Sequence, residues 1–204
     1  MTCAPLSEAS EHHIQIGSRI QSLRRDYFIS SENFFLTETL TALLDSRSQQ
    51  QGAAIALIDR GKPVSFAALA RESRSVASGL RKLGIGAGDR VALWLPNVPA
   101  WLATFFACAQ LGAIAVSVNT RFRSHELADI LQRSGARALF FWPEFKGIDF
   151  EQILAACEPA ALSSLKLRVA YDESGKAPAA GLLSYSVLAA GEPLLASFAS
   201  AEAG

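Results

Sequence analysis

The sequence predicts an α/β protein with a largely parallel sheet and flanking helices. Segments with the pattern of strands alternate with segments of helical pattern along the chain, as in α/β folds. The clearest unit is the charge-free run over 91–120, which Arg90 and Arg121 bracket. Its length would suit a membrane span, but the Pro-Asn-Val-Pro stretch at 96–99 interrupts any continuous helix. The run is therefore predicted to be a buried strand–helix–strand unit rather than a membrane span.

The three parts of that run follow from its composition. Residues 91–95 and 114–118 are short apolar segments, the second rich in β-branched residues, and both are predicted as strands buried on two faces. Residues 100–111 have the length of a crossover helix. Together they form one βαβ unit.

The segment before this run is predicted to contain a helix, a hairpin and a longer helix. The longer helix begins after Ser65, whose hydroxyl is a good N-cap, and ends at Gly84, which tolerates the left-handed cap conformation. The predicted elements are a helix over 36–44, a strand over 53–58, a turn over 59–62, a strand over 64–66 and the helix over 67–83.

The segment after the run continues the alternation. Ser124 is predicted to cap a helix that Glu126 favours in its first turn and that Gly135 ends. The predicted elements are that helix through 134, a strand over 138–142, a helix over 150–157, a strand over 165–171, a loop over 172–180 and a short helix over 182–189.

The domain prediction has three parts. Residues 1–32 are predicted to be a partly ordered lead-in with a short amphipathic helix on Ile16, Ile20 and Leu23. Residues 33–191 form the α/β unit, and residues 192–204 form a tail. The length of 204 residues suffices for a sizeable core.

Charge and cysteine content limit the functional classes. Lys plus Arg equals Asp plus Glu at 19 each, so net charge offers no attraction to nucleic acid. Residues 59–90 are locally basic, which fits a solvated helix face or an anion site. Cys3, Cys108 and Cys157 form no disulfide framework, so a reducing cytoplasm is expected, and the N-terminus lacks a secretory signal. Cys108 is predicted to be a core residue.

Known catalytic and metal-binding patterns are missing from the chain. The glycine cluster at 84–88 follows a helix and precedes a strand, whereas a dinucleotide fingerprint follows a strand and opens a helix. A free-standing dinucleotide-binding domain is therefore disfavoured, and the cluster is predicted to be a cap and turn. No spacing matches a zinc site and no nucleophile elbow is present. No catalytic or metal-ligating residue is assigned.

Residues 40–142 resemble the beginning of the AMP-forming adenylate synthetases, the superfamily of acyl-CoA synthetases, firefly luciferase and peptide-synthetase adenylation domains. Order and spacing carry the resemblance, which continues more weakly to residue 191. The matching segments are AIALID at 54–59, VSFAAL at 64–69, LGIGAGDRVALWLPN at 83–97, AQLGAIAVSVNTRF at 109–122 and EL at 126–127. One departure is Ala68, where relatives often carry an acidic residue that completes a capping box.

The resemblance implies the N-terminal part of the firefly-luciferase-like large domain and a two-step ligase. A carboxylate and ATP, with magnesium, give an acyl-adenylate, and coenzyme A then gives a thioester. The family's phosphate loop and C-terminal lysine have no counterpart here, so the chain is expected to be an inactive N-terminal piece that holds no cofactor itself. Its uncovered apolar surface is expected to form homo-oligomers.

Three residues match positions that contact coenzyme A in some relatives. These are Thr120 and Arg121, in the loop after the second strand of the βαβ unit, and Lys146, after the following strand. Cationic side chains suit phosphates, although ordinary loop-surface charge is the alternative. A second functional class stays open as well, a non-catalytic α/β interaction or binding module.

Overall fold

The computed structural model describes residues 39–173 and 178–191. The predicted lead-in over 1–32, including its helix, and the predicted tail over 192–204 lie outside the described residues. The helices are α2 (Leu40–Gln50), α3 (Phe66–Lys82), α4 (Pro99–Leu111), α5 (Ser124–Ser134), α6 (Phe150–Ala155), the 3₁₀ turn η1 (Pro159–Leu162) and α7 (Tyr185–Ala189). The strands are β1 (Ile55–Asp59), β2 (Lys62–Ser65), β3 (Arg90–Trp94), β4 (Ile114–Ser117), β5 (Ala138–Phe141), β6 (Glu144–Phe145), β7 (Ile148–Asp149), β8 (Leu167–Ala170) and β9 (Leu183–Ser184).

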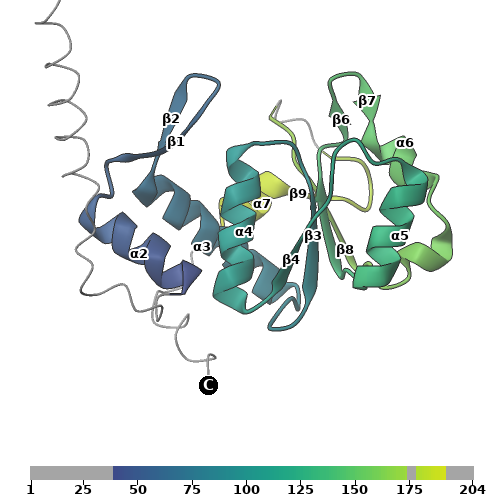
Figure 1. The fold of residues 1–204 in the computed structure, drawn as a ribbon, viewed down its shortest axis with the longest axis horizontal. Coiled ribbons are helices and arrows are strands. Elements are labelled where there is room, and N and C mark those ends of the chain that lie inside the picture. Colours follow the sequence, from purple (N-terminus) through teal and green to yellow (C-terminus); the bar gives the residue numbers. More distant parts are fainter. Residues whose placement is uncertain (1–38, 174–177, 192–204) are drawn as a thin grey trace, which may run out of the picture. The chain divides into compact units, whose positions relative to one another are not determined.

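A five-stranded sheet with the order β4-β3-β5-β8-β9 forms the centre (Figure 1). Every neighbouring pair in it is parallel, with Val91 of β3 opposite Ala115 of β4 on one side and Ala138 of β5 on the other. The prediction of a largely parallel sheet is therefore confirmed. Two short antiparallel hairpins, β1–β2 and β6–β7, accompany the sheet.

Helices cover both faces of this sheet, with α3, α4 and α7 on one face and α5 and α6 on the other (Figure 1). Alternation along β3 decides which face each side chain joins, since Leu93 packs in the first layer and Trp94 in the second. The result is a three-layer α/β arrangement with a core on each side of the sheet.

The charge-free run folds as β3, α4 and β4, so the predicted βαβ unit is confirmed. Pro99 occupies the first turn of α4, where its missing N–H costs nothing, and Gly112 ends the helix in a left-handed conformation. Among the described residues, no helix has the length and apolar character that crossing a bilayer requires. One prediction here was wrong: β4 is not buried on both faces, because it is an edge strand and Ile114 is 52% exposed.

The caps of α3 match their prediction. The Ser65 hydroxyl accepts a hydrogen bond from the Ala68 N–H at 3.2 Å, and Gly84 follows the helix with φ 79°.

The cap of α5 differs from its prediction. Arg123, not Ser124, is the N-cap, because the Glu126 carboxylate accepts a hydrogen bond from the Arg123 N–H at 3.1 Å. Hydrogen bonds from its own backbone N–H and from that of Arg123 lower the pKa of the Glu126 carboxyl group.

Three further elements differ from the prediction. The helix Leu40–Gln50, with Thr39 as its N-cap, continues six residues beyond the predicted end at 44, whereas the predicted start at 36 lies outside the described residues. The segment predicted as a helix over 182–189 begins as strand β9, which completes the sheet before α7 starts. The β6–β7 hairpin was missed, because two-residue strands carry almost no periodicity.

The glycine cluster forms the turn between α3 and β3, as predicted, and lies at the amino-terminal edge of the sheet. Arg137 pairs with the Asp89 carboxylate at 2.7 Å and holds its pKa below the usual range, helped by the Gly86 N–H at 2.9 Å. Beside them, Arg90 donates to the carbonyls of Ser134 and Gly135. These groups bond to one another within the fold, apart from Arg137 Nε, which is buried without a hydrogen-bond partner.

Candidate functional site

The candidate site is a cavity of about 920 Å³ at the edge where the parallel strands end. Residues just after β3, β4 and β5 line it, among them Asn97, Thr120 and Trp142. Ligands of open α/β sheets bind at this carboxyl edge, because loops there are free to vary while the strands hold them in place. The site therefore lies where the fold favours a ligand.

Two hairpin turns also contribute residues to this cavity. Arg60, in the β1–β2 turn, has φ 46°, and Lys146, in the β6–β7 turn, has φ 52°. They are the two non-glycine residues of the described chain with positive φ, and each precedes a glycine with positive φ. Consecutive left-handed residues are typical of the tight turns that match the twist of a hairpin. Each turn thus places one cation beside the cavity.

Of the three residues predicted to contact coenzyme A, the structure brings two together. Thr120 and Lys146 both line the cavity, whereas exposed Arg121 is not among its lining residues. Arg121 lies next to the lining in a short turn, where its N–H donates to the Asn119 side chain at 2.9 Å. The Trp94 indole N–H donates to the Asn119 carbonyl at 3.1 Å and ties this loop to the sheet.

Lys146 and Arg60 are both exposed, but they differ in their partners. The Lys146 ammonium lies 5.4 Å from the ring centroid of Phe145, and within the described residues no carboxylate pairs with it. An unpaired, exposed ammonium beside a cavity can bind an anionic group at little desolvation cost. Its position fits the phosphate contact that the sequence predicts.

Arg60, in contrast, is paired with two carboxylates. It contacts its neighbour Asp59 at 2.8 Å, and it reaches Glu173, beyond the end of β8, at 2.7 Å. The guanidinium lowers the pKa of both carboxyl groups. The Tyr171 hydroxyl also donates to Glu173 at 2.9 Å, and burial raises the pKa of that phenol.

The aromatic residues that line the cavity are Trp101, Phe122, Trp142 and Phe145, and further rings pack behind them. The Trp142 ring lies 4.8 Å from Phe145 and 5.0 Å from Tyr171, centroid to centroid, and Trp101 stacks on Phe105 at 5.6 Å. Such surfaces suit a flat or apolar portion of a ligand. The cavity therefore combines an apolar wall with cationic groups at its margins.

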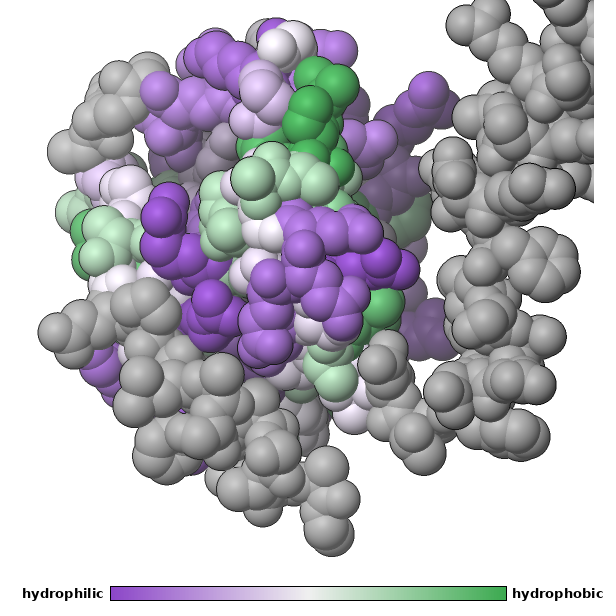
Figure 2. All heavy atoms as spheres, turned by 90° about the vertical axis from the view of Figure 1, so that its left-hand side faces the viewer, coloured by the Kyte–Doolittle hydropathy of each residue, from purple (hydrophilic) through white to green (hydrophobic). Residues whose placement is uncertain are grey.

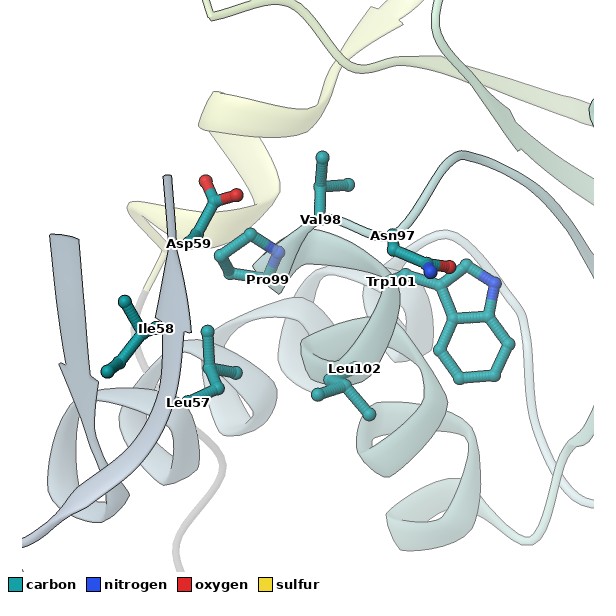
Figure 3. Close-up of a pocket in the computed structure, with 8 residues that line it drawn as sticks. All are labelled: Leu57, Ile58, Asp59, Asn97, Val98, Pro99, Trp101 and Leu102. Carbon is teal, nitrogen blue, oxygen red and sulfur yellow. The ribbon is translucent and has the colours of Figure 1, made fainter. Parts of the chain in front are cut away.

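A smaller groove of about 380 Å³ adjoins the same region, between β1 and the first turn of α4 (Figure 3). Its lining is mostly apolar, with Leu57 on β1, Pro99 and Leu102 on α4, and Asp59 at the end of β1. Asp59 also lines the larger cavity. The β1–β2 hairpin is thus part of both.

The remaining sequence candidates show no reactive geometry. Cys108 is buried in the core, and desolvation raises the pKa of its thiol to about 12, so it is a core residue as predicted. Cys157 is also a buried free thiol. Across residues 39–173 and 178–191, no three His, Cys, Asp or Glu side chains gather in a way that could hold a metal ion.

Sequence reasoning missed Arg60, Trp142 and Phe145 as cavity residues. The Arg-Gly and Lys-Gly pairs at 60–61 and 146–147 were a usable signal, because X-Gly pairs between short strands are typical of tight hairpins. Nothing local, however, indicated that both turns would line the same cavity.

The structure is that of an α/β protein with a cavity at the carboxyl edge of a parallel sheet. A family model described as AMP-binding enzyme matches residues 44–192. The chain belongs to this AMP-binding enzyme family, which confirms the resemblance seen in its sequence.

Individual relatives agree with this assignment. The chain is 38% identical over 106 residues to a putative acyl-CoA synthetase, YngI, of Bacillus subtilis, covering 52% of this chain and 19% of the relative. It is 36% identical over 146 residues to the mitochondrial medium-chain acyl-CoA ligase ACSF2 of Macaca fascicularis, covering 67% and 24%. The chain therefore spans about a quarter or less of the length of these relatives.

A solved structure supports the fold as well. The crystal structure of the anthranilate CoA ligase AuaEII in complex with anthranoyl-AMP superposes with a TM-score of 0.68 at 26% identity. The match covers 76% of this chain and 28% of that one. About three quarters of this chain therefore shares its fold with part of that ligase.

Proposed function

We propose that this chain contributes the N-terminal α/β part, over residues 33–191, of an ATP-dependent, AMP-forming acyl-CoA synthetase. The observation that carries the proposal is the family match over 44–192, together with relatives named as acyl-CoA synthetases and ligases. In the proposed reaction, a carboxylate displaces pyrophosphate from ATP to give an acyl-adenylate. The thiol of coenzyme A then displaces AMP to give the thioester.

The chain's own contribution is proposed to be binding of coenzyme A. Thr120 and Lys146 line the cavity, and Arg121 lies beside it, so a hydroxyl and two cations are available to phosphate oxygens. The aromatic rings near Lys146 offer an apolar surface to the rest of the molecule. Magnesium would offset charge on the phosphates of ATP, but the described residues offer no set of ligands for it, so no metal-dependent step is derived from this chain.

Thioester formation by the product of the complete gene tests the proposed reaction. With ATP, magnesium, coenzyme A and a panel of aliphatic and aromatic carboxylates, we expect AMP and a thioester in equal amounts. Binding of coenzyme A without thioester formation from any carboxylate would contradict the synthetase and favour a non-catalytic binding module.

Replacing Lys146 with glutamine is expected to weaken coenzyme A about fivefold to tenfold, because one charge-assisted hydrogen bond to phosphate is lost. Arg121→Gln should have a similar effect. In the assay this appears as a higher KM for coenzyme A with kcat almost unchanged. Lys166→Gln is the control, since Lys166 is exposed and does not line the cavity. Equal effects of all three variants would contradict a specific phosphate contact.

We also propose that apolar surface outside the cavity supports a homo-oligomer. Leu40 and Leu43 of α2 and Ile55 and Ile58 of β1 are large exposed apolar side chains, with Ile58 64% exposed. Figure 2 shows apolar residues among polar ones on the left-hand face of Figure 1, to which α2 and β1 belong. We infer that these exposed apolar side chains contribute to a contact between copies of the chain.

Ile58→Lys is expected to shift the protein toward monomer in sedimentation velocity, because a buried ammonium would disfavour the contact. Val187→Lys is the matched control, since Val187 is an equally exposed apolar residue on α7. A wild-type protein that stays monomeric at high concentration would contradict the oligomer. We also propose a cytoplasmic location, which differs from the mitochondrial location in the name of the relative ACSF2.

A further inference from the structure

Two carboxylates hold the guanidinium of Arg60 on its two sides. On the inner side, Nε and Nη2 donate to the Asp59 carboxylate at 3.2 and 2.8 Å. On the outer side, Nη1 donates to Glu173 Oε2 at 2.7 Å and Nη2 donates to Glu173 Oε1. Each carboxylate therefore binds the Arg60 guanidinium in a bidentate manner, Asp59 through Nε and Nη2 and Glu173 through Nη1 and Nη2.

The two carboxylates differ in their distance from Arg60 along the chain. Asp59 is the chain neighbour of Arg60, so its contact orients the group locally. Glu173 is separated from Arg60 by 113 residues and comes from the segment after β8. A planar fork of two N–H groups is the arrangement that phosphate oxygens also prefer. Glu173 thus occupies the pair of N–H groups, on Nη1 and Nη2 of Arg60, that a phosphate would use.

The backbone at Arg60 sets its position at the cavity. Its φ of 46° is unfavourable for a residue with a Cβ, and glycine or asparagine is the usual choice at such a turn position. An arginine at this position is therefore held by the contacts of its side chain. It lines the same cavity as Lys146, which comes from the other hairpin turn.

The Arg60–Glu173 pair is also exposed enough to exchange. The Arg60 side chain is 60% exposed and that of Glu173 is 32% exposed. Exposed pairs contribute little net stability, since water and salt compensate for their loss. An anion that enters the cavity can replace one carboxylate on the outer fork without leaving a buried charge unpaired.

We propose that Arg60 is a binding residue for a phosphate group of the cavity's ligand, and that Glu173 is a built-in competitor for the same face of its guanidinium. Binding of the phosphate displaces Glu173 and releases the β1–β2 turn from the end of β8. The identification of the phosphate as part of coenzyme A or ATP rests on the proposed function, whereas the competition itself does not.

Removing the competitor and removing the binding residue should have opposite effects. Glu173→Gln is expected to tighten pyrophosphate binding about fivefold, because an exposed ion pair no longer has to be broken. Arg60→Gln is expected to weaken it about tenfold, because a charge-assisted contact is lost. In Arg60→Gln/Glu173→Gln, the effect of the Glu173 substitution should disappear.

The measurement is calorimetric titration of the whole chain with pyrophosphate at fixed low salt. Glu158→Gln and Arg168→Gln are the charge-matched controls, because both residues are exposed and neither lines the cavity. Glu173→Asp keeps the charge but shortens the side chain, so it should tighten binding by less than Glu173→Gln. Far-UV circular dichroism verifies that each variant is folded. If Glu173→Gln does not fold, Glu173→Asp is used to test the proposal instead.

Unchanged or weaker pyrophosphate binding in Glu173→Gln, relative to Glu158→Gln, would overturn the proposal, as would wild-type affinity in Arg60→Gln. A parallel titration with coenzyme A separates the proposals. Opposite effects on pyrophosphate without binding of coenzyme A would support the competition and contradict the assignment of coenzyme A to this cavity. Binding of coenzyme A that is insensitive to both residues would support the assignment of coenzyme A to this cavity and contradict the competition at Arg60.

Discussion

Replacing Trp94 with alanine is expected to lower the free energy of unfolding by about 3–5 kcal/mol, the largest effect of any single substitution considered for this fold. Trp94 is fully buried at the end of β3, and its ring lies 4.5 Å from Phe150 and 6.4 Å from Phe141. The truncation removes this aromatic contact and leaves a cavity in the layer between the sheet and helices α5 and α6. Denaturant unfolding followed by far-UV circular dichroism measures the loss.

Trp94→Phe separates packing from the loop contact. The variant keeps a buried ring but loses the hydrogen bond from the indole N–H to the Asn119 carbonyl, which positions the loop carrying Thr120 and Arg121. We expect a stability loss of about 1 kcal/mol for that bond and a further cost for the smaller ring. Coenzyme A affinity should fall about threefold, because the loop is less constrained.

Phe141→Leu is the control for Trp94→Phe. Phe141 packs in the same layer but does not bond to the 119–121 loop, so this variant should lose stability while affinity for coenzyme A stays constant. If both variants changed affinity equally, the indole hydrogen bond would not position the loop.

Replacing Arg90 with methionine is expected to destabilise the fold by about 2–4 kcal/mol. The Arg90 guanidinium donates to the carbonyls of Ser134 at 2.8 Å, Gly135 at 3.0 Å and Gly88 at 2.9 Å. Two of these carbonyls belong to the end of α5, where the last carbonyl groups of a helix have no intrahelical N–H donor. Methionine keeps the apolar stem but leaves the carbonyls without this donor, and thermal unfolding measures the cost.

Arg168→Met provides the comparison for Arg90→Met, because Arg168 is exposed on β8 and its loss should change stability by less than about 0.5 kcal/mol. At temperatures where the Arg90 variant is folded, its affinity for coenzyme A should equal that of the wild type. A reduced affinity together with unchanged stability would mean that Arg90, like Arg121, acts in ligand binding.

The two arginines that bracket the charge-free run thus have different roles, although sequence alone presents them alike. Arg90 lies at the beginning of β3 and binds carbonyls of α5 across the amino-terminal edge of the sheet. Arg121 follows β4 at the opposite edge, beside the cavity, and no carboxylate of the described chain pairs with it. Strand direction accounts for the difference, since a residue before a strand and one after it lie at opposite edges.

The two strands in that run also differ in burial, although their sequence patterns are alike. The apolar segments over 91–95 and 114–118 predict the same environment, yet β3 is buried and β4 is at the edge with Ile114 exposed. Hydrophobicity indicates that a segment tolerates burial, but strand order decides whether neighbours cover it. Strand order is a property of the whole sheet.

Local chemistry by itself determined the strands and helices, the cap at Ser65 and the turn at Gly84, and the alternation of these elements indicated a parallel sheet. Each element, cap and turn depends on residues within a few positions, so periodicity and backbone preference suffice to predict it. Tertiary structure alone decided that residues near positions 60, 120 and 145 line one cavity, and that Glu173 meets Arg60. Those contacts join residues far apart in the chain, and only packing of the helices on the sheet brings them within reach.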